Sequence, residues 1–145
     1  MARQISIWFQ DETERLLSER TQTHDDAEGS RSRLIAGLIA RYDEVVRRSI
    51  PQLSEKEWML VADALNGIWL LEEPRHVHYT ELEIADGIRL NKLDTKWEVD
   101  GDELLRKVHA LDYARRLAIV DVVERLWCDP QADFAVKLRE WGVLR

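Results

Sequence analysis

The chain has 145 residues, and its 21 Lys+Arg against 28 Asp+Glu give a formal net charge of −7. With 45% hydrophobic and 34% charged residues, six Gly and three Pro, the composition is typical of a soluble globular protein rich in helices, and it excludes disordered and collagen-like chains. No apolar run approaches the roughly 20 residues of a membrane helix, and no secretory signal is predicted. A single cysteine, Cys128, favours the reducing cytoplasm.

The first 22 residues predict a short strand followed by a helix. Residues 4–9 alternate, with Ile5, Ile7 and Phe9 on one side, which is the pattern of a strand with one buried face. Asp11 stands three residues before Glu14, the spacing of a capping box, so a helix is expected from Asp11 to about residue 22.

A long second helix is predicted after the loop at residues 23–29. Ser30 is a favourable N-cap for it. Its apolar residues recur at the helical period, and they are Leu34, Ile35, Leu38, Ile39, Tyr42, Val45 and Val46. A lone strand leaves its backbone groups unpaired, so we expect a homodimer or a higher homo-oligomer that pairs the strands and packs the long helices together.

The order of strand, capped helix and second helix resembles the ribbon-helix-helix family, the Arc and MetJ type of bacterial repressor. The resemblance covers roughly residues 3–48 and rests on the strand, the helix from Asp11 and the run from Gly29 to Ile35 that leads to Tyr42. It implies a dimer that places a two-stranded ribbon in the major groove of double-stranded DNA. The DNA-contacting residues that it implies are Arg3, Gln4, Ser6, Trp8, Ser30, Arg31, Ser32 and Arg33.

The chemistry of these residues suits DNA. Gln4 and Ser6 can hydrogen-bond base edges, and the N–H groups of Ser30 to Ser32, with the neighbouring arginines, are expected to hold a phosphate. Trp8 departs from the family, which usually has a polar or basic residue there. It could pack on thymine methyl groups, on the sugar edge or against the protein.

Pro51 marks the boundary between two predicted domains. Residues 1–50 form the DNA-binding and dimerisation domain, with 8 basic and 9 acidic side chains. Residues 51–145 form an acidic domain, with 13 basic and 19 acidic side chains, for oligomerisation or for binding a partner or effector. The negative charge is thus concentrated away from the DNA-binding residues.

The C-terminal domain is predicted to be all-α, which makes the fold class mainly α with an N-terminal ribbon-helix-helix. Ser54 and Glu57 form a capping box before a helix to about Leu71. Further helices are expected from Thr80 (with Leu82, Ala85 and Ile88 on one face), from Asp102, over residues 112–127 and after Pro130. Five of the six tryptophans lie in this domain and are expected to fill its core, namely Trp58, Trp69, Trp97, Trp127 and Trp141.

Three functions remain open. The leading hypothesis is a sequence-specific transcriptional repressor or autoregulator. The first alternative is an antitoxin or adaptor whose C-terminal domain binds a partner protein. The second is a metal-responsive regulator that uses His76 and His78, which on a strand would point the same way, although we expect histidines of the surface or of a loop there. No catalytic motif is found, so we expect neither enzymatic activity nor a cofactor.

Overall fold

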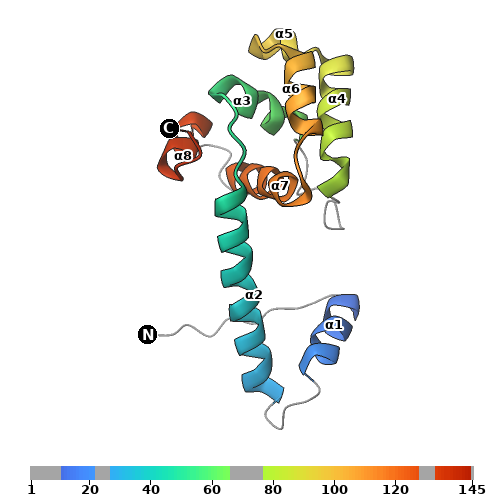
Figure 1. The fold of residues 1–145 in the computed structure, drawn as a ribbon, viewed down its shortest axis with the longest axis vertical. Coiled ribbons are helices and arrows are strands. Elements are labelled where there is room, and N and C mark those ends of the chain that lie inside the picture. The colour runs from blue at the N-terminus through green and yellow to red at the C-terminus, as the bar shows by residue number, and fades with distance from the viewer. Residues whose placement is uncertain (1–10, 22–26, 66–76, 128–132, 145) are drawn as a thin grey trace. The chain divides into compact units, whose positions relative to one another are not determined.

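The computed structural model describes residues 11–21, 27–65, 77–127 and 133–144, and within these ranges every regular element is a helix (Figure 1). The chain divides into two compact units, Met1–Asp43 and Glu44–Arg145. The division falls inside a long helix rather than at Pro51.

The N-terminal unit contains α1 (Asp11–Thr21) and the first part of α2 (Ala27–Ser49). Both helices were expected from the sequence, but α2 begins three residues before Ser30. Ser30 is therefore inside the helix and is not its N-cap. Ala27 is a strong helix former, which favours the earlier start.

The assignment to the ribbon-helix-helix family, and with it the fold class with an N-terminal strand, is wrong for the part of the chain that the structure describes. That part contains helices and no strand. The predicted strand at residues 4–9 lies outside the described residues. The helical half of the prediction depended on apolar period and caps, which do not by themselves identify a family.

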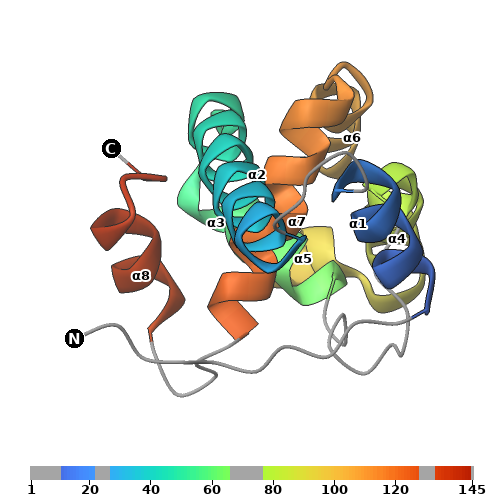
Figure 2. The ribbon, with the colours of Figure 1, turned by 90° about the horizontal axis from the view of Figure 1, so that it is seen from below.

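The C-terminal unit is built around α3 (Glu55–Ala64). This helix packs against α4 (Thr80–Asn91), α5 (Leu93–Trp97) and α7 (Tyr113–Trp127), while α4 also packs against α6 (Gly101–His109). Figure 1 shows α4 and α6 side by side with α7 crossing below them. In Figure 2, α8 (Phe134–Glu140) lies on the other side of α3 and α7 from α4 and α6.

Side chains cap several helices of this unit by accepting a hydrogen bond from a backbone N–H group. Ser54 and Glu57 form the predicted capping box. Two caps that were not predicted are also present: Asp100 caps α6, which begins at Gly101, one residue before its predicted start, and Asp133 caps α8. Helix α3, however, ends at Ala64, earlier than predicted.

The buried face of α4 differs in part from the predicted one, because Ile88 packs against the core but Leu82 does not. Leu82 is 57% exposed, whereas Ile84 and Gly87 are buried. A Cβ atom on Gly87 would lie 2.8 Å from Leu93 Cδ1 and 3.0 Å from Ala64 Cβ, so this glycine lets α4 approach α3 closely. Thr80 is not the cap of α4, because it is its first helical residue and its buried hydroxyl donates to the Val77 carbonyl at 2.7 Å.

Two short elements accompany the helices that were expected. A 3₁₀ turn at Val77–Tyr79 precedes α4, and α5 is a five-residue helix. Both residues that bound α5, Lys92 and Glu98, have left-handed backbone conformations with φ of 54°. Glycine or asparagine usually signals such a conformation in a sequence, and neither is present at these two positions.

The core of the C-terminal unit is apolar and confirms the role predicted for Trp58, which is fully buried. Trp97, Trp127 and Trp141 are partly buried against this core, and Trp69 lies outside the described residues. Other large side chains buried in the core are Leu60, Leu65, Ile84, Leu104, Ile119, Leu126 and Leu138. No described helix has both the length and the apolar character needed to cross a membrane.

Glu57 is a nearly buried carboxylate that joins α3 to α6. Its Oε1 accepts a hydrogen bond from Lys107 Nζ at 2.6 Å, and its Oε2 accepts one from the Ser54 backbone N–H at 2.7 Å. Its side chain is only 8% exposed. Burial raises the pKa of Glu57, but the bonds from Lys107 and Ser54 outweigh burial and hold this pKa below the ordinary value of 4.5.

The lowered pKa makes this contact sensitive to acid. The stabilisation is complete above about pH 4.5 and is lost as the pH falls through the lower pKa of the folded state. Glu57→Gln is expected to lower the free energy of unfolding at pH 7 by about 1–2 kcal/mol, because Lys107 loses its anionic partner while glutamine can keep the capping bond.

Urea titrations between pH 3 and 7 measure this effect. The free energy of unfolding of the Glu57→Gln variant should depend less on pH below 4.5 than that of the wild type. Glu140→Gln is the control, because Glu140 is 58% exposed and 3.8 Å from its partner Lys137. Equal pH profiles for wild type and Glu57→Gln would show that the Glu57–Lys107 pair does not stabilise the fold.

Candidate nucleic-acid interface on helix α2

Helix α2 exposes a continuous apolar surface. Its apolar residues are spaced by three, four and three positions, which is the repeat of a helix–helix seam, and they are Ile35, Leu38, Tyr42 and Val45. We call the exposed apolar residues of this surface the apolar stripe. Its members are Leu38 (38% exposed), Ile39 (62%), Tyr42 (41%) and Val45 (44%). Contiguous exposed side chains of this size mark an interaction surface.

The described part of the N-terminal unit has little core to compensate for this exposure. Among the side chains that the structure describes in it, Leu17 is the one buried apolar side chain. Burial of apolar surface is the main source of folding free energy, so a unit with so small a core needs further burial to be stable. A second helix laid against the apolar stripe would provide it.

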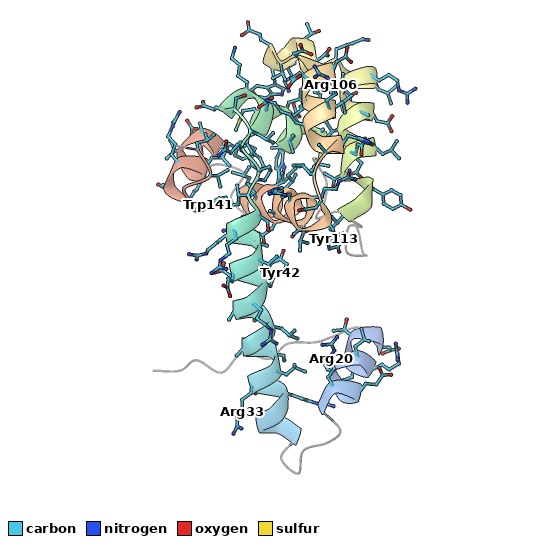
Figure 3. All side chains as sticks on the ribbon, in the orientation of Figure 1. Arg20, Arg33, Tyr42, Arg106, Tyr113 and Trp141 are labelled. Carbon is cyan, nitrogen blue, oxygen red and sulfur yellow. The ribbon has the colours of Figure 1, made fainter. Side chains whose placement is uncertain are left out.

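The other side of α2 carries arginines. Successive residues of a helix are about 100° apart, so Arg33 lies half a turn round the axis from Tyr42. Figure 3 shows Arg33 and Tyr42 on opposite sides of the helix. We call this side the arginine face, and it consists of the exposed residues Arg33, Arg41, Arg47 and Arg48.

Small residues, namely Ala36, Gly37 and Ala40, lie between Arg33 and Arg41. The guanidinium group of Arg41 lies over Gly37, where a Cβ atom would be 3.1 Å from a guanidinium nitrogen. Arg48 forms an ion pair of 2.8 Å with Glu44 one turn earlier, and both side chains are largely exposed. An exposed pair of this kind contributes little and is easily exchanged for another anion.

Arg31 is placed differently from the other arginines of α2. Its guanidinium forms an ion pair of 2.7 Å with Glu14 and donates a hydrogen bond of 3.0 Å to Ser18 Oγ. Both partners belong to α1, and Arg31 is half-buried. It therefore joins α1 to α2, and its predicted phosphate contact stays a prediction, while Ser32 and Arg33 are exposed.

The predicted phosphate site at the start of α2 also changes. Because α2 begins at Ala27, the helical N–H groups without a carbonyl partner inside the helix are those of residues 27–29. The N–H groups of Arg31 and Ser32 lie within the hydrogen-bonded part of the helix. The side chain of Ser30 and the whole of Arg3, Gln4, Ser6 and Trp8 lie outside what the structure describes, so their predicted roles stay predictions.

Arg41, Arg47 and Arg48 were missed in the sequence. Their signal was nevertheless present, because at a period of 3.6 Arg47 and Arg48 stand away from the apolar residues, whereas Arg41 stands at the edge of the apolar side, one turn before Val45. The period that marks the apolar residues of α2 also marks the polar side of the same helix.

The described residues hold little that points to other chemistry. They contain no group of three His, Cys, Asp or Glu side chains that could hold a metal ion. His76, the side chain of His78 and Cys128 lie outside these residues. A hollow of about 130 Å³ is lined by Met59, Asp63, Lys96, Trp97, Trp127 and Phe134, which is smaller than a typical ligand site.

Comparison with known proteins found no family model that matches the chain, no similar curated protein and no similar solved structure.

Proposed function

We propose that this protein is a cytoplasmic, homodimeric DNA-binding regulator that represses transcription. The observation that carries the proposal is the two-sided exposure of α2, with the apolar stripe on one side and the arginine face on the other. The apolar side suits a second protein surface, and the basic side suits the phosphates of DNA.

A second copy of the chain is the partner that best fits the apolar stripe. In a two-fold dimer the same stripe is used by both protomers, so each α2 covers the exposed residues of the other. The arginine faces then point outward and every contact with DNA is doubled. Doubling matters here because the chain is acidic overall and each protomer offers few cations to the phosphates.

Sequence-specific binding would depend on the residues before α1. Gln4 can form two hydrogen bonds with an adenine edge, and Ser6 can bond several bases. Arg33, with the exposed arginines that follow it on α2, would bind phosphates and fix the position of the protein on the duplex. Arg31 would act as a positioning residue, because it joins α1 to the helix that carries these arginines.

Binding of the protein to the DNA upstream of its own gene, compared with random DNA at ~150 mM salt, tests the proposal. We expect the wild type to prefer a site in the upstream DNA. The double variant Gln4→Ala with Ser6→Ala should lose most of this preference, because each good base contact contributes about 1–3 kcal/mol of discrimination between sequences. It should keep the weaker binding to random DNA, which depends on phosphate contacts.

Gln131→Ala serves as a control that removes a glutamine from the C-terminal segment, and it should bind as the wild type does. A wild type that binds no upstream site more tightly than random DNA would refute sequence-specific regulation.

A partner protein is the second candidate, favoured by apolar side chains exposed at α4. Tyr79 precedes the helix and Leu82 lies one turn later, and their exposed fractions are 48% and 57%. An antitoxin or adaptor would use such side chains to bind its partner. This function would be supported over DNA binding alone if the protein product of a neighbouring gene co-purifies with the wild type. The same product should be lost from the Leu82→Ser variant.

A further inference from the structure

The hollow of about 130 Å³ in the C-terminal unit has walls that are mainly aromatic. Its three rings come from three different helices, since one stands at the end of α5, one at the end of α7 and one at the start of α8. We call this hollow the aromatic pocket. Its lining residues are Met59, Asp63, Lys96, Trp97, Trp127 and Phe134.

Contacts within the protein hold the three rings in place. Trp127 Nε1 donates a hydrogen bond to the Ala62 carbonyl at 3.1 Å, and Trp97 Nε1 donates one to Asp63 Oδ2 at 3.0 Å. The Phe134 ring packs edge-to-face against Trp127, with 5.2 Å between the ring centroids and an angle of 85° between the planes. Because both indole N–H groups are bonded and the rings are fixed, little ordering is needed when a ligand binds.

The charged groups of the aromatic pocket neutralise each other. Lys96 Nζ lies 2.6 Å from Asp63 Oδ2 and 5.2 Å from the centre of the Trp97 ring. With its carboxylate and its ammonium paired, the pocket favours a neutral ligand over an ion, which would lose its hydration without gaining a counter-charge. Asp63 Oδ1, by contrast, accepts no hydrogen bond within the part of the chain that the structure describes. A ligand with an O–H or N–H group can donate to this oxygen.

The volume of the aromatic pocket suits a single ring. An apolar protein cavity of about 150 Å³ takes up one benzene molecule, whereas sites for drug-sized ligands measure about 300–1,000 Å³. Aromatic rings also prefer to meet another ring in an edge-to-face or offset arrangement, which adds to the free energy gained by burying their area. Size and wall chemistry therefore both select one aromatic ring.

We propose that the aromatic pocket binds a small neutral aromatic molecule with one hydrogen-bond donor, of which phenol is the simplest example. The ring lies among Trp97, Trp127 and Phe134, and the donor bonds Asp63 Oδ1. Binding at this site does not require the DNA contact proposed for the N-terminal unit, so each of the two can fail alone.

A titration of the full chain with phenol, without DNA, tests the site. Two-dimensional NMR of the ¹⁵N-labelled protein follows the indole N–H resonances, which single Trp→Phe variants assign. We expect the resonances of Trp97 and Trp127 to shift with a dissociation constant on the order of 1 mM, as is usual for so small a ligand. The resonance of Trp141, which does not line the pocket, should stay in place.

Two related ligands separate the ring from the donor. Fluorobenzene has the shape of phenol but no donor, so it should bind about 10-fold more weakly, the usual effect of one hydrogen bond to a charged group. Cyclohexanol keeps the donor but has no aromatic ring, and it should bind about 3- to 10-fold more weakly than phenol.

Phe134→Ala removes one wall of the pocket and should weaken phenol binding about 10-fold. Tyr113→Ala is the matched control, because it also removes an aromatic ring from the C-terminal unit. Tyr113 is 66% exposed and begins α7 (Figure 3), whereas Trp127 ends this helix at the pocket. Its affinity for phenol should equal that of the wild type. Asp63→Asn replaces one carboxylate oxygen by an amide NH₂ group, so this variant should bind phenol and fluorobenzene equally.

The proposal is overturned if the resonances of Trp97 and Trp127 stay in place up to about 10 mM phenol, where a site of this affinity is nearly saturated. It is also overturned if all indole resonances shift alike, which indicates non-specific contact, or if fluorobenzene binds the wild type as tightly as phenol. Circular dichroism checks that Phe134→Ala is folded. If it is not, the comparison of phenol with fluorobenzene on the wild type and on Asp63→Asn still decides.

Discussion

Replacing Trp58 by alanine is expected to lower the free energy of unfolding of the C-terminal unit by about 3–5 kcal/mol, the usual cost of removing a large aromatic side chain from a core. Trp58 has no exposed surface and is the largest of the fully buried side chains in the described part of the chain. A domain of this size is typically stable by about 5–15 kcal/mol, so the variant loses a large part of that stability. Urea unfolding followed by circular dichroism measures the change.

Trp58→Phe separates loss of packing from loss of polarity. The indole Nε1 of Trp58 is buried and has no hydrogen-bond acceptor among the described residues. Phenylalanine removes this unsatisfied group, which offsets part of the lost contact area, so we expect a cost of only about 1–2 kcal/mol. If alanine costs no more than phenylalanine, the site is not the close-packed core that the structure describes.

The second large effect is expected at the apolar stripe. Leu38→Glu with Ile39→Glu should convert the proposed dimer into a monomer, because two protomers would bury four unpaired carboxylates at one interface. We expect the dissociation constant to rise at least about 100-fold, which corresponds to about 2.8 kcal/mol. Sedimentation equilibrium over a range of concentrations measures it.

Ala40→Glu is the matched control for this variant, because it adds a carboxylate to an exposed position of α2 on the side of the arginine face. Its mass in solution should equal that of the wild type, although its affinity for DNA should fall. A wild type that sediments as a monomer at tens of micromolar would contradict the dimer, whatever the variants do.

Much of the helical framework could be predicted because its signals are local. The Ser54–Glu57 capping box and the apolar periods of α2 and α7 depend only on residues within a few positions of one another. Backbone groups at a helix start must find a partner nearby, so a suitable side chain at the right spacing is a sufficient signal.

Other features failed because a distant contact decided them. The buried face of α4 is set by the close approach at Gly87, which brings in Ala64 and Leu93. The role of Arg31 is set by its partners Glu14 and Ser18 on α1, which no pattern around Arg31 reveals. The start of α2 at Ala27 shows that a good N-cap residue such as Ser30 can also lie inside a helix when the preceding residues favour it.

The amino-acid sequence by itself determined the helical character of the C-terminal unit, the placement of Trp58 in its core and the amphipathic nature of α2, since these depend on composition and period. Only the tertiary structure decided that the apolar stripe stays exposed and that Arg31 forms an ion pair with Glu14 of α1. It also decided that Arg48 and Arg139, which are far apart in the chain, line one groove. The physical reason is that exposure and proximity depend on which helices pack together, and side chains distant in the sequence make that choice.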